Sequence, residues 1–161
     1  MGDNKLLGAA AVGLVPLTVI GGVVALLLMG TGSQATSCNP AATSVVVDPA
    51  TVPQEPVSGY GGVQLVNAAW ILRAGADLGL GARDQTIGVM TAMGESSLTV
   101  LDHGDAAGPD SRGLFQQRDN GAWGSYDDRM DPYTSATSFF TALQAIADRD
   151  TLEPTIVAHR V

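Results

Sequence analysis

The first pattern along the chain is a long apolar stretch, residues 6–29, that contains no charged residue. As a helix, a stretch of this length would span roughly 36 Å, enough to cross the hydrocarbon core of a bilayer. The apolar part of a secretory signal is usually only about 7–15 residues long. We therefore expect residues 1–29 to be an uncleaved membrane anchor, while the small residues around Ser33, Gln34 and Ala35 leave a cleaved signal as the alternative.

The charges on either side of this stretch predict its orientation. Lys5 precedes it, and the next basic residue along the chain is Arg73. Because basic residues next to a membrane span stay in the cytoplasm, the amino terminus is expected there. The sequence therefore predicts a single-pass protein of the cell membrane whose remaining residues are extracytoplasmic.

Residues 30–61 are rich in Gly, Ser, Thr, Ala and Pro, a composition typical of a flexible linker. We expect this segment to hold a folded domain away from the membrane. It contains Cys38, the only cysteine, so no internal disulfide can form. Outside the membrane, Cys38 could instead link two chains into a disulfide-bonded dimer.

From residue 62 onward the apolar residues recur with helical spacing. The first helix is expected to end at Gly79 and Gly81, and a second is expected to start with Asp84 as its N-cap and to end near Glu95. The apolar positions that predict the first helix are Val63, Val66, Trp70, Ala74 and Leu78, and those that predict the second are Ile87, Met90 and Met93.

A polar loop is expected over residues 97–112, followed by a short helical turn at residues 113–117. Asp131 and Pro132 then form a cap with proline at the first helical position. They open a third long helix, with its apolar positions at Tyr133, Ala136, Phe139, Phe140, Leu143 and Ile146. Strand signals are weak, so the fold class is mostly α, with one domain over residues 62–161.

A fourth helical pattern begins at Pro154 and stops at Val161. A helical domain of this size needs its last helix to close the core. We therefore expect that the chain is a fragment of a longer domain or packs with a partner. Phe139, Phe140, Leu143 and Ile146 would otherwise leave a large uncovered apolar surface.

The charge balance limits the classes of ligand. Acidic residues outnumber basic ones 16 to 8, so no basic patch is expected to neutralise nucleic-acid phosphates. The recognition of a ligand would have to rest on hydrogen bonds and on aromatic or apolar faces rather than on positive charge. Asp102, Asp105 and Asp110 cluster in one loop, but they do not fit a calcium-loop pattern, and no metal or other cofactor is expected.

Glu95 is the candidate catalytic residue. The chain has only three glutamates, and Glu55 and Glu153 lie in a Pro-rich segment and just before Pro154. Glu95 follows an apolar stripe and sits at a predicted helix C-terminus. Burial and the negative end of the helix dipole would both raise the pKa of its carboxyl group. A carboxylic acid that stays protonated near neutral pH can act as a general acid and donate its proton to a leaving group.

The motif around Glu95 is Met93-Gly94-Glu95-Ser96-Ser97-Leu98, and after a loop the chain reads Ser111-Arg112-Gly113-Leu114-Phe115-Gln116-Gln117. The pair resembles the first two motifs of lytic transglycosylases and goose-type lysozymes. More closely, it is similar to lysozyme-like domains of membrane-anchored bacterial cell-wall hydrolases. The resemblance covers residues 62–161 and implies cleavage of the β-1,4 bond between N-acetylmuramic acid and N-acetylglucosamine in peptidoglycan.

The resemblance also implies roles for individual residues. Glu95 would act as general acid and then as general base, with no second carboxylate required. Ser111 would hydrogen-bond near Glu95, and Gly113 would permit a close approach. Gln116 and Gln117 would contact the glycan. The family's third motif has Asn and Tyr at positions that read Ser135 and Ala142 here, so Tyr133 and Trp123 are the replacement stacking faces.

Three functional readings follow. The first is lytic transglycosylation, in which the sugar's own 6-hydroxyl attacks and leaves a 1,6-anhydro product. The second is a muramidase, with one aspartate of the loop positioning a water for hydrolysis. The third is a non-catalytic wall-binding component of a secretion or conjugation apparatus.

Overall fold

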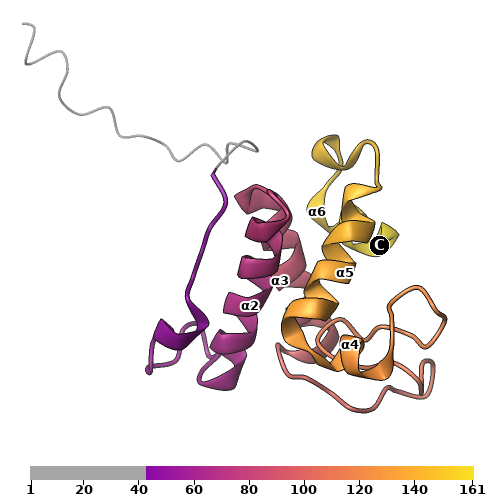
Figure 1. Ribbon diagram of the computed structural model, residues 1–161, viewed down its shortest axis with the longest axis horizontal. Helices are drawn as coiled ribbons and strands as arrows, with labels where there is room; N and C mark the ends of the chain where they lie inside the picture. Colours follow the sequence, from indigo (N-terminus) through magenta and orange to yellow (C-terminus); the bar gives the residue numbers. More distant parts are fainter. Residues whose placement is uncertain (1–42) are drawn as a thin grey trace, which may run out of the picture. The chain divides into compact units, whose positions relative to one another are not determined.

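The computed structural model describes residues 43–161 and is mostly helical over that range, which confirms the predicted fold class (Figure 1). It contains five α-helices and two short 3-10 helices, and no strand occurs among these residues. The elements are η1 (Pro49–Thr51), α2 (Val63–Asp77), α3 (Ala82–Ser96), α4 (Tyr126–Met130), α5 (Pro132–Gln144), η2 (Arg149–Thr151) and α6 (Pro154–Arg160).

The core forms where α2 packs against α3 and α5, with α6 closing the side made by α3 and α5. Two glycines allow the helices to approach. A Cβ on Gly88 of α3 would overlap the ring of Phe140 on α5, and a Cβ on Gly75 of α2 would lie 2.8 Å from Cγ of Gln85. Since Phe140 is fully buried, its ring has no room to move away from Gly88.

The predicted uncovered apolar surface on the third helix is wrong for the described residues. Phe139 is 3% exposed, and Phe140 and Leu143 are fully buried, while Ile146 packs against the core and is partly buried. The reason is that α5 packs against both α2 and α6, and Val157 of α6 is also fully buried.

The ends of the helices follow the predicted chemistry in most places. Leu78 and Gly79 end α2, with Gly79 in the left-handed conformation at a φ of 72°. Asp131 caps α5 by accepting the backbone N–H of Thr134 at 2.7 Å, with Pro132 at the first position.

The predicted N-cap of the second helix is wrong. Gly81, not Asp84, is the N-cap of α3, and Asp84 lies inside the first turn with 6% exposure. Its carboxylate is turned toward the guanidinium of Arg149 in η2, with Oδ2 3.3 Å from Nε. A partner 65 residues away in the chain therefore holds the side chain that local sequence assigned to a cap.

Part of the expected linker packs on the domain. Val45 and the side chain of Gln85 exchange two hydrogen bonds: Val45 N–H donates to Oε1 at 2.7 Å, and Nε2 donates to Val45 O at 2.8 Å. The same Nε2 donates to Leu72 O at 2.6 Å, and η1 packs on α2. Residues 43–61 thus extend the domain at its N-terminal side.

The predicted anchor at residues 6–29, residues 30–42 and Cys38 lie outside the described residues. Of the helices in residues 43–161, none is both long enough and apolar enough to cross a bilayer.

Candidate functional site

The C-terminus of α3 carries Glu95 and is fixed from several sides. Leu98 N–H donates to Ala92 O at 3.1 Å, which closes the helix end, and Ser97 follows in the left-handed conformation at a φ of 51°. Two side chains of α2 bind the carbonyls that follow: Gln64 Nε2 donates to Ser97 O at 2.8 Å, and Asn67 Nδ2 donates to Leu98 O at 2.9 Å. The predicted end of this helix near Glu95 is confirmed.

The side chain of Glu95 is exposed, so the burial expected for it is wrong. The apolar positions of α3 that enter the core, Ile87 and Ala92, are fully buried. Glu95 comes one turn after Ala92, on the exposed side of α3, and its carboxyl group projects into an open hollow instead.

Ser96 joins the two motifs that the sequence analysis identified. Its hydroxyl Oγ lies 2.8 Å from the carbonyl oxygen of Leu114 and 3.0 Å from that of Ala92, and the residue is 8% exposed. No role was expected for Ser96 from the motif that contains it. Its position next to Glu95 at a buried helix end is the signal that could have identified it.

Residues 112–117 form a tight turn rather than the predicted short helical turn. Arg112 and Gln117 pair through two backbone hydrogen bonds of 3.0 and 2.9 Å, and Gln116 lies in the left-handed region at a φ of 47°. Gly113 N–H donates to Leu101 O at 2.7 Å, which ties the turn to the preceding loop. These bonds between separate segments of the backbone use the N–H and C=O groups that a helix would have paired internally.

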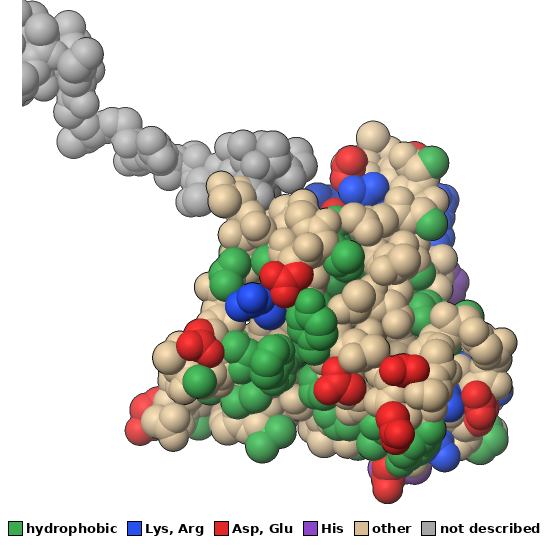
Figure 2. Space-filling view, in the orientation of Figure 1, with side chains coloured by type: hydrophobic (Ala, Val, Ile, Leu, Met, Phe, Trp, Pro, Cys, Tyr) green, Lys and Arg blue, Asp and Glu red, His purple; other side chains and the backbone are tan. Residues whose placement is uncertain are grey.

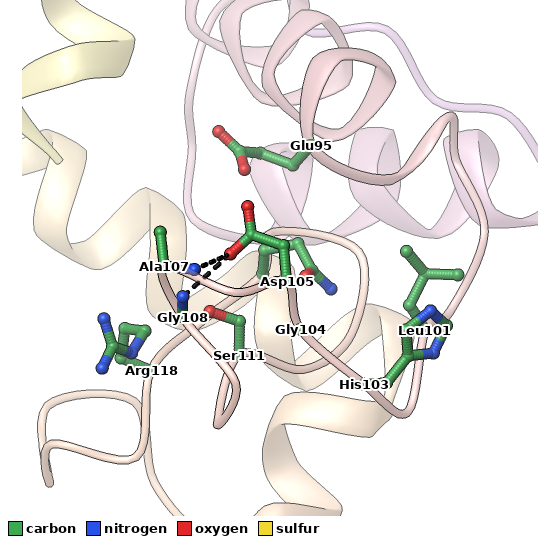
Figure 3. Close-up of a pocket in the computed structure, with 10 residues that line it drawn as sticks. Glu95, Leu101, His103, Gly104, Asp105, Ala107, Gly108, Ser111 and Arg118 are labelled. Carbon is green, nitrogen blue, oxygen red and sulfur yellow. Dashed lines mark hydrogen bonds between the residues drawn. The ribbon is translucent and has the colours of Figure 1, made fainter.

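Two hollows meet at Glu95, and Glu95, Gln116 and Arg118 line both of them. The larger, about 410 Å³, lies between α3 and the loop (Figure 3). Its other lining residues are Leu101, His103, Gly104, Asp105, Ala107, Gly108 and Ser111. The smaller, about 230 Å³, is completed by Thr91, Phe115, Gln117, Trp123, Phe139, Ala158 and Val161.

Of the three loop aspartates, only Asp105 lines the larger hollow with Glu95. Its Oδ1 accepts the backbone N–H groups of Ala107 at 2.9 Å and Gly108 at 2.8 Å, which fix its orientation. Figure 3 shows its carboxyl group facing that of Glu95 across the hollow. The remaining two are engaged elsewhere: Asp102 lies 3.2 Å from His103 Nδ1, and Asp110 pairs with Arg118.

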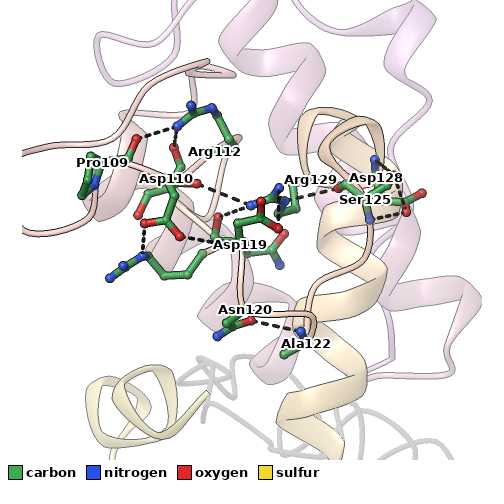
Figure 4. Close-up of polar contacts among 12 residues, drawn as sticks. Pro109, Asp110, Arg112, Asp119, Asn120, Ala122, Ser125, Asp128 and Arg129 are labelled. Atoms are coloured by element: carbon green, nitrogen blue, oxygen red, sulfur yellow. Dashed lines mark hydrogen bonds and ion pairs between the residues drawn. The ribbon is translucent and has the colours of Figure 1, made fainter.

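A buried arginine holds the far side of this loop (Figure 4). Arg129 of α4 is 3% exposed, and its Nη2 lies 3.2 Å from Asp119 Oδ1. Its Nε donates to Ser125 O at 3.2 Å, and its Nη1 lies 3.4 and 3.5 Å from the carbonyls of Asp110 and Gln117. One guanidinium therefore connects four separate points of residues 110–125.

The predicted substrate-binding residues do not all line the hollows around Glu95. Ser111 and Gln116 lie beside Glu95 in the larger hollow, although no hydrogen bond joins Ser111 to Glu95 in residues 43–161. Gln117 lines the smaller hollow but is 4% exposed, and its Nε2 donates to Ser135 O at 3.1 Å. Gly113 lines neither; its close approach is to the Arg129 carbonyl, which a Cβ would overlap.

Tyr133 lies away from Glu95, so the geometry does not support its expected contact with the glycan. Its hydroxyl donates to Asp77 Oδ2 at 3.0 Å, and its ring packs edge-on against Trp70 with centroids 6.1 Å apart. In Figure 2, hydrophobic side chains gather over α2 and the segment before it, where Val57, Val63 and Trp70 are exposed. The proposed alternative stacking face, Trp123, does line the smaller hollow.

Within residues 43–161, no three Asp, Glu, His or Cys side chains come close enough together to hold a metal ion. No protein-family model matches the chain, and no curated protein matches it either. The candidate function therefore rests on the motifs of the sequence and on the geometry around Glu95.

Proposed function

We propose that the protein cleaves the β-1,4 glycosidic bond between N-acetylmuramic acid and N-acetylglucosamine in peptidoglycan, with Glu95 as general acid and then general base. The observation that carries the proposal is the position of Glu95 at the meeting point of two open hollows. A polymer that lies across both would pass directly over this carboxyl group. We assign the helical domain to the lysozyme-like type on the same motifs.

The chemistry requires a proton at the glycosidic oxygen as positive charge develops on the anomeric carbon. Glu95 donates that proton to the leaving sugar. The acetamido group of the substrate can act as the internal nucleophile, so no enzyme nucleophile is needed. Glu95, now a carboxylate, then takes a proton from the group that attacks the anomeric carbon.

The hollows differ in a way that suits an amphiphilic sugar chain. Polar groups of Asp105, Ser111 and Arg118 surround the larger one, and these side chains can exchange hydrogen bonds with sugar hydroxyls. Trp123, Phe115 and Phe139 contribute to the smaller one, where an apolar ring face can pack. Gln116 lines both and is the best-placed neutral side chain for a contact near the scissile bond.

The identity of the attacking group separates two reactions. The motif resemblance favours lytic transglycosylation, in which the 6-hydroxyl of the same sugar attacks. The facing carboxyl group of Asp105 is the specific observation that favours the second candidate, hydrolysis, because a second carboxylate can hold a water molecule on the opposite side of the sugar.

Peptidoglycan lies outside the cytoplasmic membrane, which agrees with the predicted extracytoplasmic domain on a single-pass anchor. The third reading, a wall-binding component of a secretion or conjugation apparatus without catalysis, requires no function for Glu95.

The test is to digest purified peptidoglycan with the whole protein in detergent and to identify the released fragments by mass spectrometry. Anhydro-ended fragments are expected for transglycosylation. Fragments heavier by one water, with a reducing end, are expected for hydrolysis. If purified protein that binds the wall releases no glycan fragment, the catalytic proposal is wrong and the wall-binding reading replaces it.

A further inference from the structure

Among residues 43–161, Arg118 is the only basic residue that lines both hollows around Glu95. Glu95 and Asp105 line the larger one with it, and residues 43–161 contain no ion pair between Arg118 and either carboxyl group. Neutral side chains can supply the hydrogen bonds that sugar hydroxyls need, so an uncharged glycan does not require the positive charge that Arg118 adds to both hollows. The position of this charge is therefore the feature to explain.

The orientation of the Arg118 side chain is set by Asp110. Arg118 Nε donates to Asp110 Oδ1 at 2.6 Å. The Asp110 carboxyl group also accepts the backbone N–H of Asp119 at 2.8 Å through Oδ2. That backbone bond and Arg118 both hold the pKa of Asp110 below its usual value, so its carboxylate stays charged and keeps Nε in place.

The outer edge of the guanidinium remains open. Among residues 43–161, Asp110 is the only hydrogen-bond partner of the Arg118 side chain, and it uses Nε alone. The two Nη groups carry four further N–H donors. The side chain is half exposed, and a Cβ built on Gly108 would lie 3.6 Å from Nη1, so this edge lies over the wall of the larger hollow.

A guanidinium that is fixed through Nε and open at both Nη atoms has the geometry to bind a carboxylate with two parallel hydrogen bonds. We propose that Arg118 binds a carboxylate carried by the glycan, so that the site selects acidic, muramic-acid-containing strands over neutral glycans of the same backbone. This inference rests on the proposed function. The carboxylate has two possible sources, the lactyl group of a peptide-free muramic sugar and the peptide attached to it.

The test measures binding in the Glu95→Gln protein, whole chain in detergent, so that no ligand is consumed. The ligands are three oligosaccharides of equal length: peptide-free muramic oligomers, peptide-bearing oligomers, and neutral N-acetylglucosamine oligomers. We expect Arg118→Gln to weaken binding of one or both acidic ligands about tenfold or more, the usual scale for a charge-assisted pair. The acidic ligand that loses affinity identifies the source of the carboxylate.

Arg160→Gln is the matched control. Arg160 also pairs with an aspartate, with Nη1 3.3 Å from Asp148 Oδ1, and it is exposed to a similar extent, but it lines neither hollow. Arg118→Lys keeps the charge and is expected to retain part of the preference for acidic ligands. Asp110→Asn weakens the contact that orients Arg118 but keeps the guanidinium, so it should lower the preference for acidic ligands less than Arg118→Gln does.

The outcomes separate this inference from the proposed function. An equal loss of affinity for acidic and neutral ligands in Arg118→Gln, reproduced by Asp110→Asn, would mean that Arg118 only supports the loop. An unchanged affinity for all three would also overturn the inference. Failure of the Glu95→Gln protein to bind any of the three would count against the proposed function itself.

Discussion

Among residues 43–161, the hydroxyl of Ser96 makes the only hydrogen bond between α3, the helix that carries Glu95, and the turn of residues 112–117. We expect Ser96→Ala to leave the buried Leu114 carbonyl without its partner and to lower the free energy of unfolding by about 1–2 kcal/mol. Because Gln116 sits on the same turn, the rate of glycan cleavage should also fall. Denaturant unfolding and initial rates on purified peptidoglycan measure the two effects.

Ser97→Ala is the control for that prediction. Ser97 is exposed, and its side chain makes no hydrogen bond within residues 43–161. It should unfold and turn over like the wild type. Wild-type stability and rate in Ser96→Ala would show that this bond does not organise the site.

At the scale of single residues, the sequence predicted the positions of residues that depend on their neighbours in the chain. The position of Glu95 could be predicted from the end of a periodic helix, and those of Ser111 and Gln116 from a motif close behind it. Tyr133 was misplaced because its position depends on which face of α5 meets α2, where Asp77 binds its hydroxyl. The orientation of Arg118 depends on Asp110 in a folded loop, for which no periodic pattern exists.

At the scale of elements, the crossing of α3 and α5 depends on the absence of a side chain at Gly88. Gly88→Ala would force a methyl group into the buried ring of Phe140, and overpacking of this kind costs about 1–3 kcal/mol. Gly94 lies in the same helix with nothing within 4 Å of a built Cβ. Gly94→Ala should therefore be neutral or stabilise the protein by about 0.5–1 kcal/mol. Thermal unfolding of both variants checks the pair; equal stability would contradict the packing.

The helical periods predicted α2, α3, α5 and α6, because each buries one apolar face. They did not predict α4, which has five residues and no complete stripe. Its signal is a capping box instead: the Ser125 hydroxyl accepts the N–H of Asp128 at 3.2 Å, and the Asp128 carboxylate accepts the N–H of Ser125 at 2.8 Å. The packing of residues 43–61 on the domain could not be predicted either, since it depends on the distant Gln85.

At the scale of the whole molecule, the chain is acidic, with a net charge of −8, and its helical part carries an open site and follows a predicted membrane anchor in the sequence. The acidity makes the position of Arg118 in the site more informative, because basic side chains are few. A second glutamate outside the site provides the most direct control for a substitution at Glu95. Glu95 lies in the site, whereas Glu153 is exposed at the start of α6 and its side chain makes no capping hydrogen bond.

The decisive measurement compares Glu95→Gln with Glu153→Gln in the release of glycan fragments from purified peptidoglycan by the whole protein. Glutamine keeps the size of the side chain but has no proton to transfer to the leaving sugar. Glu95→Gln should lower the rate by at least ~10²-fold, the usual scale for loss of a general acid, with unchanged thermal unfolding. Glu153→Gln should cleave like the wild type. A Glu95→Gln protein with wild-type turnover would contradict the assignment of Glu95 as the catalytic acid.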